Sequence, residues 1–161
     1  MDVFERKLIK SEKIGLIHPM LIFPNEDFQE SARKYPSFMS KFTRLFNFDK
    51  KRMEIESIEG VLKKEITTID YCISAAWFFR KDLLNIVGYL DEKYFYAPED
   101  ADFCFRIWQH GYEVWFYPKV KIVHDCQRLS KKKPFSKLGV EHIKGLVYFW
   151  RKRNKAKKRS I

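Results

Sequence analysis

Three carboxylates stand within four residues, at Glu99, Asp100 and Asp102, and aromatic side chains flank them. Acidic side chains are rarely buried unless they are paired, and like charges this close together repel. Such crowding has two explanations. It can raise the pKa of one carboxylate so that the group serves as a proton acceptor, or it can form the first turn of a helix, where acidic residues complement the helix dipole.

The residues that follow this acidic cluster predict a helix. Apolar residues recur at the spacing i, i+3, i+4, i+7, at Ala101, Cys104, Phe105 and Trp108. A more polar side holds Glu99, Asp102, Arg106 and Gln109. Gly111 stands just after the pattern, where helices commonly end. The simplest role for Asp102 is an ion pair with Arg106 one turn later, worth about 0.3–0.5 kcal/mol if exposed.

Further motifs follow one another in order along the chain, from about Ile14 to Trp150. They are residues 69–76 with Arg80 and Lys81, residues 87–95, the acidic cluster, Arg106, residues 111–114, residues 117–118 and His124. In this order they resemble the C-terminal half of family-2 glycosyltransferases, and most of all the rhamnosyltransferase-like bacterial members. The resemblance implies a partial GT-A fold, which is a Rossmann-like α/β fold with a mixed sheet flanked by helices. It also implies transfer of a sugar, with inversion, from a nucleotide-sugar donor to a glycan or lipid-linked acceptor.

The resemblance implies roles for individual residues. Asp100 takes the position of the base that removes the proton of the acceptor hydroxyl, and Glu99 and Asp102 would order the acceptor or the helix start. His124 would face the donor diphosphate or its divalent metal, Mg or Mn, in a complete enzyme. The other substrate-binding candidates are Asp70, Trp77 and Arg128.

Simpler roles stay open for these other candidates. Asp70 also fits a turn or the end of a strand. Trp77, beside Phe78 and Phe79, also fits the hydrophobic core, and Arg128 also fits an exposed charged loop. His124, next to Asp125, could be an ordinary polar residue at the end of a strand.

The resemblance does not include the first half of that family, which holds the nucleotide and ends in an Asp-x-Asp motif. Asp100, Ala101 and Asp102 share those letters but match the later acidic motif by position, and Ser74 stands where the family favours glycine. We therefore expect residues 1–150 to be the acceptor-side half of a transferase, with a basic tail at 151–161. An inactive remnant that binds an acceptor or a partner chain is the alternative. A half sheet should expose an apolar face, so we expect a homo-oligomer.

Composition and charge limit the class of protein. The chain has 161 residues, 45% hydrophobic and 17% aromatic, which is typical of one folded domain. The sequence has neither an apolar run of about 20 residues nor a signal-like start, so we expect a cytoplasmic protein, with a peripheral position at the inner membrane face as the alternative. Three cysteines without a Cys-x-x-Cys spacing favour reduced thiols over zinc or disulfides. They are Cys72, Cys104 and Cys126.

The net charge of +11 is concentrated at Lys131–Lys133 and in residues 151–159. Three interpretations of the tail stay open: a solvated, frayed end, attraction to an anionic membrane, and a nucleic-acid partner. The last is the least favoured, because no aromatic residue interrupts the basic run and no binding motif is present.

Hydrophobic periodicity and turn residues predict the remaining elements. In chain order we expect a buried strand over 14–23 that is interrupted at Pro19, a turn at 24–27, a helix over 37–48, a loop over 49–64, a strand-rich segment over 67–79, a short helix over 81–87, two strands at 112–117 and 120–124 on either side of Pro118, a basic loop over 127–134, and a C-terminal helix. The apolar side of that last helix is expected to hold Phe135, Leu138, Leu146, Phe149 and Trp150.

Overall fold

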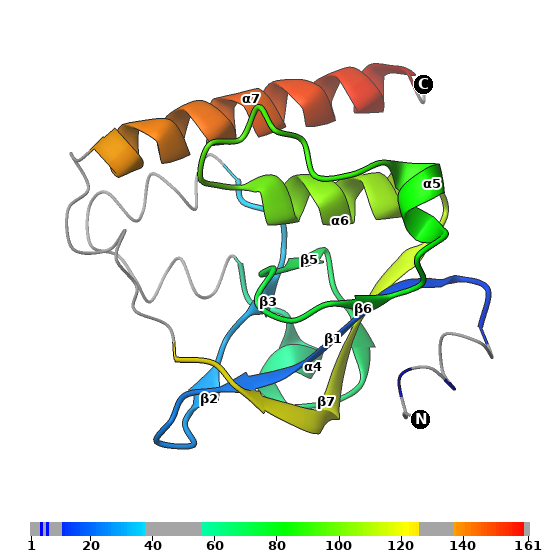
Figure 1. Ribbon diagram of the computed structural model, residues 1–161, viewed down its shortest axis with the longest axis vertical. Helices are drawn as coiled ribbons and strands as arrows, with labels where there is room; N and C mark the ends of the chain where they lie inside the picture. The colour runs from blue at the N-terminus through cyan, green and yellow to red at the C-terminus, as the bar shows by residue number, and fades with distance from the viewer. Residues whose placement is uncertain (1–3, 5, 7–10, 38–55, 126–136, 160–161) are drawn as a thin grey trace.

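The structure is a computed structural model that describes residues 4, 6, 11–37, 56–125 and 137–159 of the chain (Figure 1). Its strands are β1 (Ile14–Ile22), β2 (Phe28–Gln29), β3 (Ala32–Arg33), β4 (Thr67–Thr68), β5 (Tyr71–Cys72), β6 (Phe78–Phe79) and β7 (Glu113–Val123). Its helices are α4 (Glu59–Leu62), α5 (Leu83–Val87), α6 (Glu99–Gln109) and α7 (Lys137–Arg159). The expected α/β class, with a mixed sheet and flanking helices, is confirmed.

Two long parallel strands, β1 and β7, form the centre of the main sheet, with Leu16 opposite Val114 and Leu21 opposite Ile122. The expected interruption of the first strand at Pro19 is present as a shift of register, although β1 continues through it. The expected division of the later strand at Pro118 is wrong, because β7 is one strand. The pairing passes from Pro19–Tyr117 directly to Met20–Lys121, so the extra residues of β7 form an irregularity. Proline is tolerated at such a site because the ladder needs no donor there.

Short antiparallel strands complete this sheet on either side of the central pair. The order is β2-β1-β7-β4, and β6 also pairs with β1. The expected turn after β1 is present, since the N–H of Glu26 donates to the carbonyl of Phe23 and Asp27 accepts from the N–H of Phe23. The strand-rich segment over 67–79 is confirmed as three separate strands, of which β5 belongs to a second, two-stranded sheet with β3.

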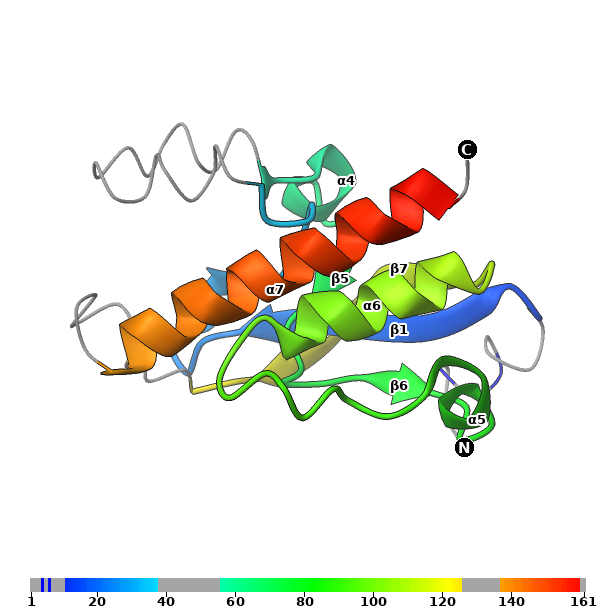
Figure 2. The same cartoon turned by 90° about the horizontal axis from the view of Figure 1, so that it is seen from above.

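Helices α6 and α7 cover one face of the main sheet in two layers (Figures 1 and 2). Side chains that alternate along β1 and β7, such as Leu16 and Phe116, share a core with buried residues of α6. Their neighbours Ile17 and Tyr117 point to the other face and form a small cluster with Phe4. Helix α7 is the outermost layer on the helical side, and it lies alongside α6.

Helix α6 begins at the acidic cluster as expected and ends before Gly111, whose φ of 80° is in the left-handed region that favours glycine. Its buried side differs from the predicted stripe. Phe103 and Ile107 are buried, while Phe105 and Trp108 are only half-buried, and Asp102 points inward with no exposed surface. The expected polar position of Asp102 is therefore wrong, because α6 lies between the sheet and α7 and has two packed sides.

Two further helices bear on the predictions. The loop expected over 49–64 contains α4 in its described part, with Val61 fully buried. Helix α7 continues through the basic run to Arg159, so this run is not frayed up to that residue. The helix expected over 37–48 lies outside the described residues except for Ser37, which is not helical. Among the helices described, none combines the length and the apolar character needed to cross a bilayer.

Candidate functional site

The first turn of α6 presents a half-buried carboxyl at Glu99. One of its oxygens, Oε2, is inaccessible to solvent and has no hydrogen-bond partner within the described part of the chain. Burial raises the pKa of Glu99, and a hydrogen bond from its own backbone opposes this only in part. Glu99 therefore holds a proton more readily than an ordinary glutamate does.

Asp100 lies beside Glu99 and faces β5. Its Oδ1 accepts a hydrogen bond of 2.7 Å from the backbone N–H of Ala101. Burial, followed by the negative charge of Asp100, raises the pKa of the Tyr71 hydroxyl. Burial and the neighbouring Cys104 raise the pKa of the Cys72 thiol, and the negative charge of Asp100 raises it further. These shifts place the Asp100 carboxylate next to the small sheet, at the start of the helix.

Asp102 belongs to a buried ionic network and not to an open site. Its carboxylate accepts hydrogen bonds from Nε of Arg106 at 3.0 Å and from the hydroxyl of Tyr94 at 3.2 Å. Nζ of Lys152, on α7, lies 2.8 Å from its Oδ1 and 2.9 Å from its Oδ2. The pair with Arg106 is as expected, but a carboxylate with no exposed surface cannot contact an acceptor sugar, which contradicts the substrate role implied for Asp102.

The same network extends to the loop before α6. Lys152 also lies 3.0 Å from Oδ2 of Asp91, which accepts a further hydrogen bond from the hydroxyl of Tyr148. Burial lowers the pKa of Lys152, but the hydrogen bonds and charges of Asp102 and Asp91 outweigh it, so the pKa is raised. Burial would raise the pKa of Asp91, and the bonds from Lys152, Lys93 and Tyr148 lower it instead. The three charges are thus mutually stabilised.

Arg106 connects this network to α5. Its Nη1 donates to the carbonyl of Val87, the last residue of α5, and its Nη2 donates to the carbonyl of Tyr89 at 2.8 Å. The guanidinium also lies over the ring of Phe103, 5.3 Å from its centroid. Helix α6, helix α7 and the loop between α5 and α6 are therefore fixed together, which holds Glu99 and Asp100 on a rigid support.

Two other predicted residues have structural contacts. Oδ2 of Asp70 accepts a hydrogen bond of 2.8 Å from the backbone N–H of Tyr35, consistent with a residue at the end of a strand. The ring of Trp77 is stacked on Phe103, with centroids 5.1 Å apart and an interplanar angle of 15°. This packing is that of a half-buried core residue.

His124 lies at the end of β7 and contacts β2. Its Nδ1 is 2.9 Å from Oε1 of Gln29, and its backbone N–H donates to Ile22. In the described ranges, no three residues of the types His, Cys, Asp and Glu lie close enough to hold a metal ion. Arg128 lies outside the described residues.

His18 is a buried polar residue that sequence reasoning missed. It has no exposed surface, and both ring nitrogens are engaged: Nδ1 with the carbonyl of Ala76 at 2.9 Å, and Nε2 with Oγ of Ser31 at 2.7 Å. Burial lowers its pKa to about 4, although the bond to Ala76 opposes this. A histidine within an otherwise apolar strand is the signal that could have identified it. His18 fixes the turn that precedes Trp77.

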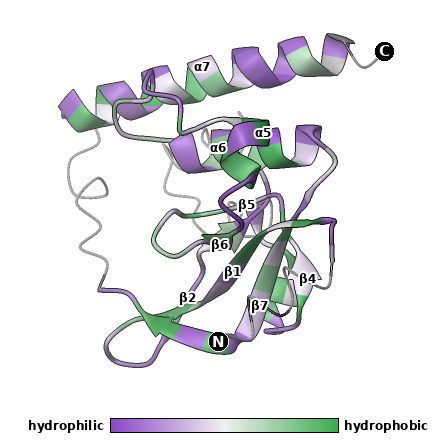
Figure 3. Ribbon diagram, turned by 45° about the vertical axis from the view of Figure 1, so that its right-hand side comes forward, coloured by the Kyte–Doolittle hydropathy of each residue, from purple (hydrophilic) through white to green (hydrophobic). Residues whose placement is uncertain are grey.

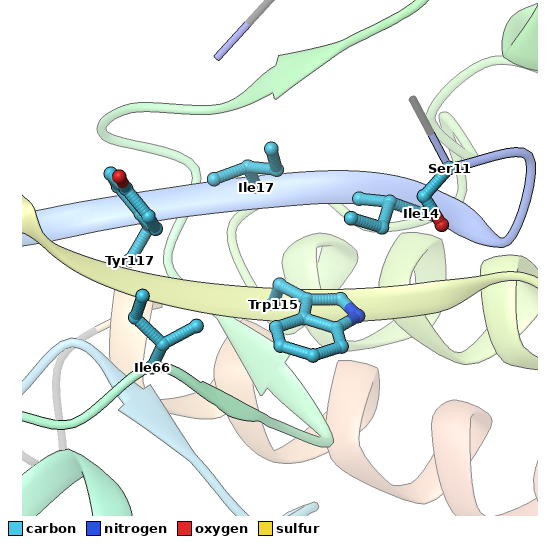
Figure 4. A pocket seen from close by; sticks show the side chains of 6 residues that line it. All are labelled: Ser11, Ile14, Ile17, Ile66, Trp115 and Tyr117. Carbon is cyan, nitrogen blue, oxygen red and sulfur yellow. The ribbon is translucent and has the colours of Figure 1, made fainter. Parts of the chain in front are cut away.

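A hollow of about 260 Å³ lies on the face of the sheet that α6 does not cover (Figure 4). Six residues from β1, β7 and two neighbouring loops line it: Ser11, Ile14, Ile17, Ile66, Trp115 and Tyr117. Its lining is mainly apolar, and no acidic residue is part of it. It is therefore unsuited to proton transfer and is not part of the site at the start of α6.

Comparisons of the chain with models of protein families, with curated proteins and with solved structures find no match. The start of α6 offers a carboxyl with a raised pKa, Glu99, next to a second carboxyl, Asp100. The same helix carries the ion pairs of Asp102 with Arg106 and with Lys152. Such a pair of carboxyls can remove a proton from a bound hydroxyl group and order that group by hydrogen bonds.

Proposed function

We propose that this chain is the acceptor-side half of a GT-A-type glycosyltransferase, which transfers a sugar from a nucleotide-sugar donor to a glycan or lipid-linked acceptor with inversion. The observation that carries the proposal is the rigid start of α6. There Glu99 and Asp100 are each partly exposed, and Asp102, two residues after Asp100, is buried and paired. The order of motifs that resembles family-2 glycosyltransferases gives the reaction type.

Asp100 acts as the general base in this proposal. Its carboxylate takes the proton of the acceptor hydroxyl, and the hydroxyl oxygen forms a bond to the anomeric carbon of the donor sugar. The bond from that carbon to the diphosphate breaks, and the nucleoside diphosphate leaves with the electron pair. Attack from the side opposite the leaving group inverts the configuration. General base catalysis of this kind contributes about 10²–10⁴-fold to the rate.

Glu99 orders the acceptor. Because burial raises its pKa, Glu99 holds a proton more readily than an ordinary glutamate and, when protonated, can donate a hydrogen bond to an acceptor oxygen. Two carboxyls with different environments can thus hold the two roles. The donor nucleotide, and the Mg or Mn ion that would neutralise its diphosphate, belong to the other half of the enzyme in this proposal.

The test is turnover by this chain combined with a donor half, by fusion or co-expression. Asp100→Asn keeps the shape of the side chain and removes the proton acceptor, so we expect activity to fall by about 10²–10⁴-fold with an unchanged circular dichroism spectrum. The matched control is Asp82→Asn, at an exposed aspartate before α5, which should keep full activity. Equal activity of Asp100→Asn and the parent would remove the assignment of the base.

A second candidate is a module that binds an acceptor glycan or a partner chain without catalysis. The raised pKa of Glu99 and the unpartnered Oε2 favour it, since a carboxyl of this kind binds a polar group whether or not a reaction follows. Turnover in a donor-half fusion separates the two candidates, whereas calorimetry with nucleotide-sugars does not. In both we expect the chain alone to bind uridine and deoxythymidine diphosphate-sugars more weakly than micromolar. Glycan binding without turnover in any donor-half fusion would favour the module.

A further inference from the structure

The side of α7 that faces away from the rest of the protein combines basic and aliphatic side chains. Among the described side chains of this helix, the exposed ones are Lys137, Val140, Ile143, Lys144, Arg151, Asn154, Lys155 and Lys158. Five of these eight are basic, and no acidic residue is among them. Val140 is 46% exposed and Ile143 is 57% exposed, so two aliphatic side chains of this helix are in contact with solvent. In Figure 3 this outermost helix carries both hydrophilic and hydrophobic segments.

These exposed residues form one continuous surface, which we call the outer face of α7. At about 100° per residue, their positions fall within roughly a third of the helix circumference. The opposite side is packed, with Leu146 and Phe149 buried, Lys152 paired with Asp102, and Arg153 over the ring of Tyr35 at 4.6 Å. The inward contacts therefore fix which side of the helix is presented outward.

We propose that the outer face of α7 binds the surface of an anionic lipid bilayer, with the helix lying parallel to the membrane plane. Helices that bind this way have a basic face and an adjoining aliphatic contact. Lys137, Arg151, Lys155 and Lys158 supply the attraction to acidic headgroups. Val140 and Ile143 enter the boundary between headgroups and acyl chains.

The composition of the outer face distinguishes a membrane from nucleic acid. Proteins that bind single strands combine basic residues with aromatic rings on which bases stack, and none of the exposed residues of α7 is aromatic. Two exposed aliphatic side chains gain nothing from contact with a phosphate backbone, whereas a bilayer accepts them together with the charges. Lys144 contributes less to the attraction, because Nζ is paired with Glu141 at 2.7 Å.

The test is binding of the full chain to vesicles of phosphatidylcholine, with and without phosphatidylglycerol, measured by co-sedimentation. We expect binding only to the anionic vesicles, and weaker binding as salt is raised. The triple substitution Arg151→Gln, Lys155→Gln and Lys158→Gln should weaken binding to the anionic vesicles roughly 100-fold. Each basic residue near the bilayer surface contributes a factor of about ten or less to this binding. The matched control removes the same charge from exposed lysines of other elements, as Lys81→Gln, Lys119→Gln and Lys121→Gln, and should bind like the parent.

A second pair of variants tests the aliphatic contact. Ile143→Ser should weaken binding to anionic vesicles, and Ile86→Ser, which changes a comparably exposed isoleucine on α5, should not. The proposal is overturned if the parent does not bind anionic vesicles, if both triple variants lose binding equally, or if Ile143→Ser binds like the parent. It is also overturned if the chain binds a single-stranded oligonucleotide at a salt concentration at which it no longer binds vesicles.

Discussion

Nζ of Lys152 lies 2.8 Å from Oδ1 of Asp102, and this pair joins α7 to α6 through a carboxylate with no exposed surface. Asp102 precedes Lys152 by 50 residues, so the pair joins two helices that are far apart in the sequence. The pair explains how a helix with so many basic residues stays packed against the domain. It also explains why the aspartate nearest the proposed base is not available to a substrate.

Removal of Lys152 should destabilise the fold. In Lys152→Met, Asp102 keeps its contacts with Arg106 and Tyr94 but loses one of its two cations. We therefore expect the free energy of unfolding to fall by roughly 2–3 kcal/mol, which is less than for a buried ion pair that has no other partner. Urea denaturation at neutral pH measures it. Lys155→Met, which makes the same change at an exposed position of α7, is the control and should be close to neutral. A parent-like midpoint for Lys152→Met would contradict a stabilising role of the network.

The pH range of this contribution follows from the two pKa shifts. Because the pKa of Lys152 is raised on folding, its contribution is complete below the ordinary lysine pKa and is lost as pH rises through the raised value. Because the pKa of Asp91 is lowered, its contribution is present above the ordinary aspartate pKa and is lost as pH falls through the lowered value. Neither loss falls near neutral pH, where the network should be intact.

His18 should make stability depend on pH between about 7 and 5. Its pKa is about 4 in the folded chain and 6.5 for an ordinary histidine, so the unfolded state takes up a proton first and stability falls as pH falls. We expect the free energy of unfolding to fall by about 2 kcal/mol as the pH falls over this range. In His18→Asn that part of the pH dependence should disappear, although the variant is less stable at pH 7. Identical pH profiles for the two chains would show that His18 is not the group responsible.

Gly145 allows α7 to lie directly on the chain before α6. A Cβ at this position would lie 2.0 Å from the carbonyl oxygen of Ala97, which is a backbone atom and cannot move away freely. We expect Gly145→Ala to destabilise by about 1–3 kcal/mol, although alanine favours a helix by about 1 kcal/mol. Asn154→Ala, at an exposed position of α7, gains helix propensity without the clash and should not destabilise. The prediction fails if both variants unfold at the parent's urea midpoint or above it.

The hollow over β1 and β7 should take part in self-association. Its apolar lining includes Ile66, which is 37% exposed, and apolar surface of this kind often marks an interface. We expect sedimentation velocity to show a dimer that dissociates on dilution, and Ile66→Asp to yield monomers. Leu62→Asp, at a side chain 51% exposed on α4 and outside the hollow, should leave the dimer intact. A monomeric parent at every concentration would exclude the interface.

The sequence was a good guide to local elements and a poor guide to their contacts. Periodicity and the acidic first turn located α6, and Gly111 its end, because both are properties of consecutive residues. The burial of Asp102 depends on Lys152, and no pattern around either residue could indicate that they meet. Lys152 and Arg153 belonged to a basic run that suggested a solvated tail, yet both point inward.

The prediction that Pro118 divides the later strand in two failed for a related reason. Pro19 and Pro118 are poor residues for a central strand when each strand is considered alone. The irregularity that accommodates the two prolines is a property of the paired strands, since it depends on how many residues of β7 lie opposite β1. The position of Asp100 at the start of a helix followed from the sequence, whereas its closeness to Tyr71 required the second sheet.

The parallel pairing of β1 with β7 has a consequence for how the chain folds. Ile14 is opposite Glu113, so the central ladder forms only after the ends of a very long loop have met. Long-range pairing of this kind folds slowly, because the entropy of loop closure opposes it before contacts compensate. During translation β1 emerges long before β7 and leaves its apolar side chains without a partner. Nascent chains should therefore be prone to aggregation until most of the polypeptide has left the ribosome.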